Sequence, residues 1–306
     1  MRLAIPDLIS NSYFPVIVAA ELGFFRDEGL DIDHVELFFP VPKAMQALKE
    51  GEFDFVAGAA HATLQAFSDW RGARLLAALA QHMYWFLVLR ADLGAKRGEL
   101  GKLKGLRIGA APGPDLGLLR LLREIGLEPG RDVQVGPVPG ASAESVSFGV
   151  TAAQALADGQ LDGFWANGMG AEVAVRRGIG TIVLDVRRGD GPEPARHYTF
   201  PALVTREDLV QRHPETAAAA VRALIRAQEC LREDPSRATA IAQPLFPPME
   251  ASLIAGLIRR DVPYYDPAIS PENFAALTQF AIEMGILSQP VPYDEVVHPL
   301  PPPREG

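Results

Sequence analysis

The sequence predicts an α/β fold built from two lobes of similar construction. Short apolar runs typical of strands alternate with helical segments from Leu3 to Asp185, and short loops connect them. This alternation is the pattern of a parallel sheet flanked by helices. It is interrupted by the polar segment 91–100 and then restarts, and a chain of 306 residues is long enough to bury two hydrophobic cores.

A short internal repeat supports the division into two lobes. The stretch 47–55 and the stretch 155–164 each consist of a helix end, a glycine turn, an aspartate and an apolar strand. Two lobes that both contribute loops at their strand ends favour a binding site between them. Chance similarity of two α/β units is the alternative explanation for the repeat.

In the first part of the chain, glycine and proline mark the ends of the expected elements. Gly23 ends the first helix, and Gly51 follows a second helix whose Ala44, Ala47 and Leu48 share one face. The expected strands are 3–5, 31–37, 53–57, 75–80 and 85–90, and the expected helices are 16–22, 43–49 and one that begins over 63–67.

The second part restarts with the stretch from Leu103 to Arg120. A strand over 106–110 runs into Pro112-Gly113-Pro114, which forces a turn, and Asp115 can cap the helix that follows. The free N–H groups of a helix N-terminus can bind an anion or a polar ligand, although an ordinary strand-to-helix connection fits these residues equally well. The elements expected next are a strand over 133–138, a loop over 139–145, a helix over 151–157, a turn, strand and loop over 158–168, a strand over 181–185 and an exposed linker over 187–196.

The C-terminal part is expected to be mostly helical. Pro271 near a helix start and Gly285 just after its end agree with the usual placement of these residues. The expected elements are a strand over 200–205, helices over 206–211, 214–231, 236–243, 249–259 and 270–284, and a loose proline-rich tail over 299–306.

Composition and motifs exclude several classes of protein. The formal net charge is -9 with no basic run, which argues against a nucleic-acid partner. Cys230 is the only cysteine and the six histidines are scattered, so neither an internal disulfide nor a metal site is expected, and no cofactor is implied. No apolar run reaches the length of a membrane span, and no signal peptide precedes the strand at Leu3.

Several stretches resemble one family of transport proteins. Tyr13-Phe14-Pro15 followed by 19–30, which contains Gly-Phe-Phe-Arg-Asp-Glu-Gly-Leu, is similar to the opening of the nitrate/sulfonate/taurine-type solute-binding proteins of ABC importers. This superfamily, the type II periplasmic binding proteins, includes proteins that bind thiamine-pyrimidine precursors. The stretches 47–55, 103–109 and 154–163 also resemble it, and the resemblance covers roughly residues 1–260.

The resemblance implies a two-lobed periplasmic-binding-protein-like fold. Each lobe has a mostly parallel sheet flanked by helices, and two crossing strands, near 83–90 and 196–205, join lobes that close on a ligand. Residues 1–88 and 200–306 are then the first lobe, and 89–199 the second. The implied partners are a small-molecule ligand and an ABC permease, with no nucleic acid, and we expect a monomer. The protein is expected to be periplasmic if a leader was removed from the chain and cytoplasmic otherwise.

The resemblance also implies ligand loops at 10–14, 38–40, 58–61, 113–115 and 165–167. Their aromatic residues offer flat apolar walls, and their polar residues offer directed hydrogen bonds. A satisfied buried histidine at position 61, and tryptophans at 85 and 165 that belong to the core, are the alternatives. The expected ligand-binding residues are Ser10, Asn11, Tyr13, Phe38, His61, His82, Trp85, Gly113, Asp115, Trp165 and Asn167.

The leading functional hypothesis is a binding protein without chemistry, which captures a neutral or singly charged organic solute, aromatic or sulfonate-like. No hydrolase, zinc-protease or nucleotide-binding motif is present. The alternative is an enzyme on the same fold, similar to thiamine-pyrimidine synthases or aromatic-acid decarboxylases, with His61 and His82 as acid–base groups. The cysteine-rich motif of those synthases is absent. A third hypothesis is the effector-binding domain of a regulator, but no helix-turn-helix precedes Leu3.

Overall fold

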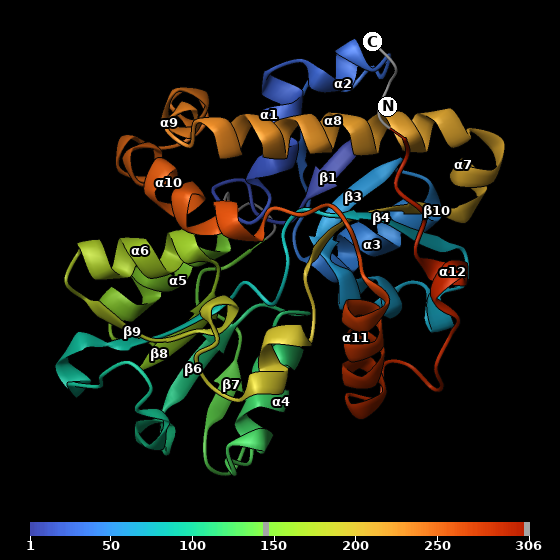
Figure 1. Ribbon diagram of the computed structural model, residues 1–306. Coiled ribbons are helices and arrows are strands. Elements are labelled where there is room, and N and C mark those ends of the chain that lie inside the picture. Colours follow the sequence, from blue (N-terminus) through green and yellow to red (C-terminus); the bar gives the residue numbers. More distant parts are fainter. Residues whose placement is uncertain (143–146, 303–306) are drawn as a thin grey trace.

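The computed structural model describes residues 1–142 and 147–302, which form two lobes, each built around its own five-stranded sheet (Figure 1). In the first sheet the order is β2-β1-β3-β10-β4, and β1 runs parallel to both β2 and β3. Strand β10 is antiparallel to its neighbours β3 and β4. The bounds are β1 (Leu3–Ile5), β2 (Glu36–Leu37), β3 (Phe55–Ala59), β4 (Ala73–Ala78) and β10 (Pro201–Arg206).

The second sheet repeats this plan, with the order β7-β6-β8-β5-β9. Strand β6 is parallel to β7 and β8, and β5 is antiparallel to β8 and β9. In each sheet four strands therefore point one way and one is reversed, which confirms two mostly parallel sheets. The bounds are β5 (Phe86–Arg90), β6 (Arg107–Ala110), β7 (Gln134–Gly136), β8 (Gly163–Ala166) and β9 (Gly180–Asp185).

The reversed strands are the first strands after each crossing between the lobes. The chain leaves the first lobe after β4 and enters the second as β5, and it returns after β9 to form β10. The two crossings hydrogen-bond to each other, since Met83 N donates to the Arg196 carbonyl over 2.9 Å. A boundary after residue 88 would divide β5, so we propose that the second lobe begins ahead of Phe86 and keep residue 200 as the return.

Helices cover both sheets, and α8 runs across the outer side of the first lobe against α1 (Figure 1). Helix α10 leaves the first lobe and packs against α6 of the second. The bounds are α1 (Phe14–Glu21), α2 (Phe24–Asp27), α3 (Val41–Glu50), α4 (Asp115–Glu124), α5 (Phe148–Ala157), α6 (Gly168–Arg176), α7 (Glu207–Arg212), α8 (Pro214–Glu233), α9 (Arg237–Ala242), α10 (Pro248–Asp261), α11 (Pro271–Glu283) and α12 (Tyr293–Val296).

Three local expectations need correction. The strand expected over 31–37 is limited to Glu36–Leu37, the two residues that pair with β1. The helix expected from 63 is a 3₁₀ helix over Ala60–Gln65. The segment 187–196 is not a fully exposed linker, because the side chain of Arg187 is 4 % exposed, pairs with Asp261 and lies over two tyrosine rings. Part of the expected loop 139–145 and the end of the tail lie outside the described residues.

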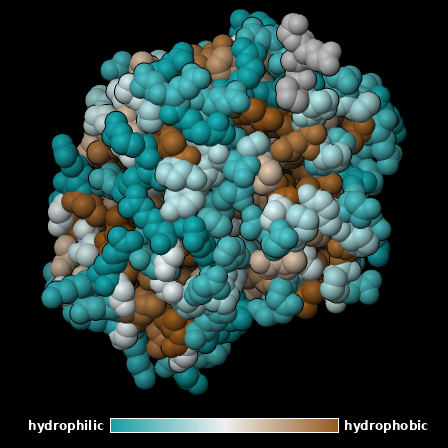
Figure 2. Space-filling view, in the orientation of Figure 1, coloured by the Kyte–Doolittle hydropathy of each residue, from teal (hydrophilic) through white to brown (hydrophobic). Residues whose placement is uncertain are grey.

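The visible face of the molecule is mainly hydrophilic, and its apolar residues are interspersed among polar ones (Figure 2). The described part of the chain has few large apolar side chains that are strongly exposed, among them Val175 and Met249. None of its helices combines the length and the apolarity that crossing a membrane requires.

Candidate ligand-binding site

A cavity lies between the two lobes, and the empty space of about 420 Å³ at this place includes open solvent. It is formed where β1, β6 and β8 end and where the first crossing passes, the position at which open α/β sheets usually bind ligands. The residues that line it are Pro6, Asp7, Tyr13, Phe39, Val41, Tyr84, Trp85, Ala111, Pro112, Pro114, Phe148, Trp165, Ala166 and Asn167.

The second lobe places the starts of two helices beside the cavity. Ser147 caps α5 by accepting from Val150 N over 3.3 Å, and Asn167 caps α6 by accepting from Met169 N over 3.0 Å. The helices approach closely because both carry glycine there: a Cβ on Gly170 would stand 2.6 Å from the backbone of Gly149. The Ser147 hydroxyl and the Asn167 amide oxygen thus accept from N–H groups at the helix starts that have no partner within their own helix.

Aromatic side chains from both lobes make up most of the wall. Tyr13 and Tyr84 join their hydroxyl groups over 2.8 Å. The rings of Phe39 from the first lobe and Phe148 from the second are nearly parallel, with centroids 6.0 Å apart. Trp165 donates from Nε1 to the Pro114 carbonyl, so its ring is fixed. The cavity is therefore suited to a flat, largely apolar molecule.

Asp7 brings a carboxyl group into this aromatic environment. Its side chain is 4 % exposed, and its Oδ2 accepts from Asn167 Nδ2 over 2.8 Å and from Ser147 Oγ over 3.4 Å. Its Oδ1 has no hydrogen-bond partner among the described residues. Burial raises the pKa of Asp7 from 3.8 to about 7, against the opposing effect of these donors and of the Phe148 and Gly149 N–H groups.

Four of the expected ligand-binding residues line the cavity: Tyr13, Trp85, Trp165 and Asn167. The remaining seven are not among the lining residues, and their role in ligand binding stays a prediction. They are Ser10, Asn11, Phe38, His61, His82, Gly113 and Asp115.

His61 connects the two lobes behind the cavity wall. Its Nε2 donates to the Gly113 carbonyl over 2.9 Å, and its Nδ1 accepts from the Thr199 hydroxyl over 3.0 Å. Burial is complete and lowers the pKa of His61 to about 4. Gly113 needs its small size, because its φ is +97° and a Cβ would stand 2.9 Å from the Val41 side chain. His61 is thus a neutral, fully bonded histidine.

The Asp115 carboxylate accepts from two N–H groups at the helix start where the sequence allows an anion or polar ligand. Its Oδ1 accepts from Gly113 N over 2.9 Å and from Leu116 N over 3.0 Å. Burial raises the pKa of Asp115. These hydrogen bonds are those of an ordinary strand-to-helix connection, and a ligand at this helix start stays a prediction.

Three other expected residues contact protein groups near the cavity. Asn11 accepts from Met169 N over 3.1 Å and donates to Asp261, and so connects the first lobe to α6. Phe38 packs edge-on against the ring of Phe53, and its neighbour Phe39 reaches the cavity instead. Ser10 accepts from Ser12 N within its own loop.

His82 lies on the first crossing, outside the cavity lining. Its ring faces the ring of His197 with centroids 5.0 Å apart. Burial and the charge of Arg196 lower the pKa of His82 to about 4. The described residues contain no group of three or more histidine, cysteine, aspartate or glutamate side chains placed to hold a metal ion.

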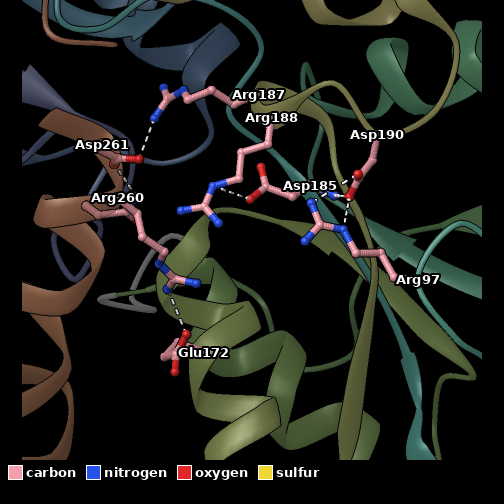
Figure 3. A network of polar contacts seen from close by, with 9 residues as sticks. Arg97, Glu172, Asp185, Arg187, Arg188, Asp190, Arg260 and Asp261 are labelled. Atoms are coloured by element: carbon pink, nitrogen blue, oxygen red, sulfur yellow. Dashed lines mark hydrogen bonds and ion pairs between the residues drawn. The ribbon is translucent and has the colours of Figure 1, made fainter. Parts of the chain in front are cut away.

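Two ion pairs made by residues of α10 also join the lobes (Figure 3). Arg260 of α10 pairs with Glu172 of α6 over 2.7 Å, and Arg187 of the second crossing pairs with Asp261 at the same distance. These pairs, with the contacts of Asp7, Asn11 and His61, hold the lobes together around the cavity.

The sequence analysis did not name Asp7, Tyr84 or Phe148 as ligand-binding residues, and within the expected ligand loop 38–40 it named Phe38 rather than Phe39. Asp7 follows Pro6 directly at the end of the first strand, and a Pro-Asp pair at that position was the available signal. Phe148 had no comparable signal, because it is one apolar residue at the start of an apolar helix.

Comparison with known proteins assigns the chain to a family. YtlA of Bacillus subtilis (strain 168), whose name describes a binding protein, is 23% identical over 298 residues, which is 94% of this chain and 84% of YtlA. The alkanesulfonate-binding protein SsuA from Xanthomonas axonopodis pv. citri, solved with MOPS, has a TM-score of 0.71 at 16% identity, with 97% of each chain covered.

The desulfurization enzyme DSZB, solved as a mutant in complex with biphenyl-2-sulfinic acid, has the same fold, with a TM-score of 0.68 at 18% identity over 97% of this chain and 96% of that one. The fold thus serves both binding and catalysis in other proteins. The model of the NMT1-like family matches residues 9–245. The chain belongs to the NMT1-like family.

Proposed function

We propose that this chain is a solute-binding protein of an ABC importer, which captures a small organic molecule with a flat aromatic part between its lobes. The observation that carries the proposal is the cavity, because both lobes and the first crossing supply its walls. A ligand in it would contact both lobes at once and would therefore favour the closed arrangement.

The cavity chemistry supports an aromatic ligand. Six aromatic side chains line it, and they present flat apolar surface on several sides. Polar groups are few, as expected for a site that takes its affinity from apolar contact and its selectivity from one or two directed hydrogen bonds. The six are Tyr13, Phe39, Tyr84, Trp85, Phe148 and Trp165.

The partner and the location belong to the same proposal. A binding protein of this kind delivers its solute to a separately encoded permease from the outer side of the membrane. The relatives support this role, since SsuA from Methylobacillus flagellatus KT is described as a periplasmic sulfonate-binding protein of an ABC transporter.

The alternative of an enzyme that uses His61 or His82 as an acid–base group has less support. Neither histidine is among the lining residues, and both ring nitrogens of His61 bond to protein groups. A general base must reach the proton that it removes, directly or through one water. We therefore propose binding without chemistry.

Tryptophan fluorescence tests the proposal directly. Two of the three tryptophans, Trp85 and Trp165, line the cavity, whereas Trp70 packs against Phe274 elsewhere. Titration with a panel of aromatic amines, amides, carboxylates and sulfonates should change the emission for at least one class. Trp70→Phe should keep that change and Trp165→Phe should reduce it.

Thermal unfolding and mass spectrometry complete the test. A solute at 100 times its dissociation constant should stabilise the chain by about 2.7 kcal/mol, and it should be recovered chemically unchanged. Consumption of the solute would support the enzyme alternative. Tight binding of sulfate or nitrate, or silence across the whole panel, would overturn the aromatic-solute proposal.

A further inference from the structure

We propose that Asp7 is the specificity-determining residue of the cavity, and that it selects flat ligands that carry an N–H donor, above all a cationic nitrogen group such as an amidine, and excludes anions. The inference rests on the proposed function, because it assigns a ligand class to the same cavity. The hydrogen bonds and charges around the Asp7 carboxyl group support this ligand class.

Every hydrogen-bond partner of the Asp7 side chain is a donor. Asn167 Nδ2 and the Ser147 hydroxyl, both from the second lobe, donate to its Oδ2. The N–H groups of Phe148 and Gly149, at the start of α5, also favour its charged form. Asp7 is therefore built into the site as an acceptor.

One oxygen of this acceptor is left unused. Asp7 lines the cavity and is 4 % exposed, yet its Oδ1 has no partner in the part of the chain that the structure describes. An unpaired buried acceptor is costly, and a charged one more so. A ligand N–H group at Oδ1 would remove this cost on binding, so the same site would bind a donor-bearing ring better than an unsubstituted one.

The rest of the cavity lacks what an anion needs. Asp7 is the one residue with a formal charge among the described residues that line it. Arg187 lies over the ring of Tyr84, 5.7 Å from its centroid, but it is not among the lining residues; its Nη1 donates to Asp261, and its Nε and Nη2 have no partner among the described residues. The N-termini of α5 and α6, which would attract an anion, are already capped by Ser147 and Asn167.

The aromatic walls add to the preference for a cation. The negative face of an indole or phenol ring attracts a positive group within about 6 Å of its centroid. Trp85 and Trp165, with ring centroids 6.0 Å apart, line the same cavity as Asp7. A positive nitrogen group on a flat ring would thus meet one carboxylate and several ring faces in one enclosed space.

Two matched series of probes test the proposal by calorimetry at neutral pH. Benzamidine, benzamide and benzoate share one ring and differ in charge, and tryptamine and indole-3-acetate do the same on a larger ring. We expect the cation to bind best in each series and benzamide to bind better than benzoate. Asp7→Asn should weaken cation binding on the order of 10- to 100-fold, because a charge-assisted hydrogen bond is lost.

Controls separate this effect from a general disturbance. Asp158→Asn makes the same chemical change at an exposed residue on the far end of α5, and it should leave all affinities as they are. Circular dichroism and melting curves show whether Asp7→Asn folds. If Asp7→Asn does not fold, the unaltered chain still tests the proposal. Cation binding beside Asp7 should release a fraction of a proton near pH 7, which calorimetry in buffers of different ionisation enthalpy measures.

The outcomes distinguish the inference from the proposed function. Tighter binding of benzoate and indole-3-acetate than of their cationic partners would overturn the inference and leave an aromatic-solute binding protein. The inference would also be overturned if Asp7→Asn bound the cations as tightly as the unaltered chain does, or if cation binding released no proton. Failure of every probe to bind at millimolar concentration would count against the proposed function itself.

Discussion

The turns after β1 and after β6 occupy equivalent places in the two sheets and use their aspartates in opposite ways. Each strand is second in its sheet order, and each is followed by proline and then aspartate. Asp115 accepts from two N–H groups of its own turn. Asp7 accepts from Ser147 and Asn167 of the other lobe and keeps one oxygen unpaired among the described residues.

Under the proposal for Asp7, this difference separates a carboxylate that stabilises its own turn from one available to a ligand. A side chain whose hydrogen-bond partners all lie in its own turn stabilises that turn whether the lobes are open or closed. A side chain satisfied across the interface loses its partners when the lobes separate, and it is exposed to whatever enters between them. Position in the fold is therefore not enough to assign a role, and the origin of the hydrogen-bond partners decides it.

The largest expected effect concerns Asp7 and pH. Its pKa is raised by burial from 3.8 to about 7, so between these values the folded chain holds a proton that the unfolded chain has lost. The free energy of unfolding should therefore fall as pH rises from 4 to 7, by up to about 4 kcal/mol from this group. Asp7→Asn lacks this term, so relative to the unaltered chain it should become more stable as pH rises from 4 to 7.

Chemical denaturation of both proteins at several pH values measures this difference. The same comparison with Asp158→Asn should give a difference that changes little with pH, because Asp158 is exposed. If the difference in unfolding free energy between Asp7→Asn and the unaltered chain does not change with pH, Asp7 is already ionised in the folded chain. The raised pKa of Asp7 would then no longer be part of the contrast with Asp115.

Much of the fold could be predicted from the sequence because it depends on local patterns. The alternation of strands and helices, the restart after residue 100 and the turn at Pro112-Gly113-Pro114 are all encoded by neighbouring residues. The reversed direction of β5 and β10 has no local signal. It follows from the path of the chain between the lobes, which the family resemblance implied through its crossing strands.

The lining of the cavity could be predicted less well than the fold, for a physical reason. Tyr13, Trp85, Trp165 and Asn167 line the cavity as expected, whereas Phe39 rather than its neighbour Phe38 does so. Which of two adjacent aromatic residues faces a cavity depends on a rotation of the backbone that residue type does not determine. The role of Asp7 depends on Ser147 and Asn167, residues 140 and 160 positions away, and a single sequence contains no signal for such contacts.

His61 extends the comparison to a second group bonded across the lobes. Burial lowers its pKa from 6.5 to about 4, so the unfolded chain takes up a proton below pH 6.5 and the folded chain does not. The contribution to stability is complete above that pH and should be lost as pH falls to 4, by about 3 kcal/mol. His61→Gln should be less sensitive to acid than the unaltered chain in denaturant titrations, and the exposed His213→Gln should not differ from it. Equal acid sensitivity of His61→Gln would show that protonation elsewhere opens the interface first.

Removal of the Asp115 side chain should have a smaller, local effect. Asp115→Ala leaves the Gly113 N–H group without its acceptor, which typically costs about 1 kcal/mol, whereas Leu116 N still donates to the Gly113 carbonyl over 3.2 Å. In a chain of this size that is a decrease in melting temperature of about 2–4 °C. If Asp115→Ala instead abolished ligand binding at unchanged stability, Asp115 would belong to the site and the contrast with Asp7 would be wrong.

The smallest effect is expected for the pair between Arg260 and Glu172, which also spans the lobes but lies near solvent (Figure 3). Their side chains are 30% and 27% exposed, so water and salt screen the attraction. A double-mutant cycle with Arg260→Ala and Glu172→Ala should give a coupling of about 0.2–1 kcal/mol that decreases with added salt. A coupling several times larger would mean that closure depends on this edge of the interface. The weak coupling that we expect would leave the buried contacts of Asp7, Asn11, His61 and Arg187 as the polar contacts that hold the lobes together.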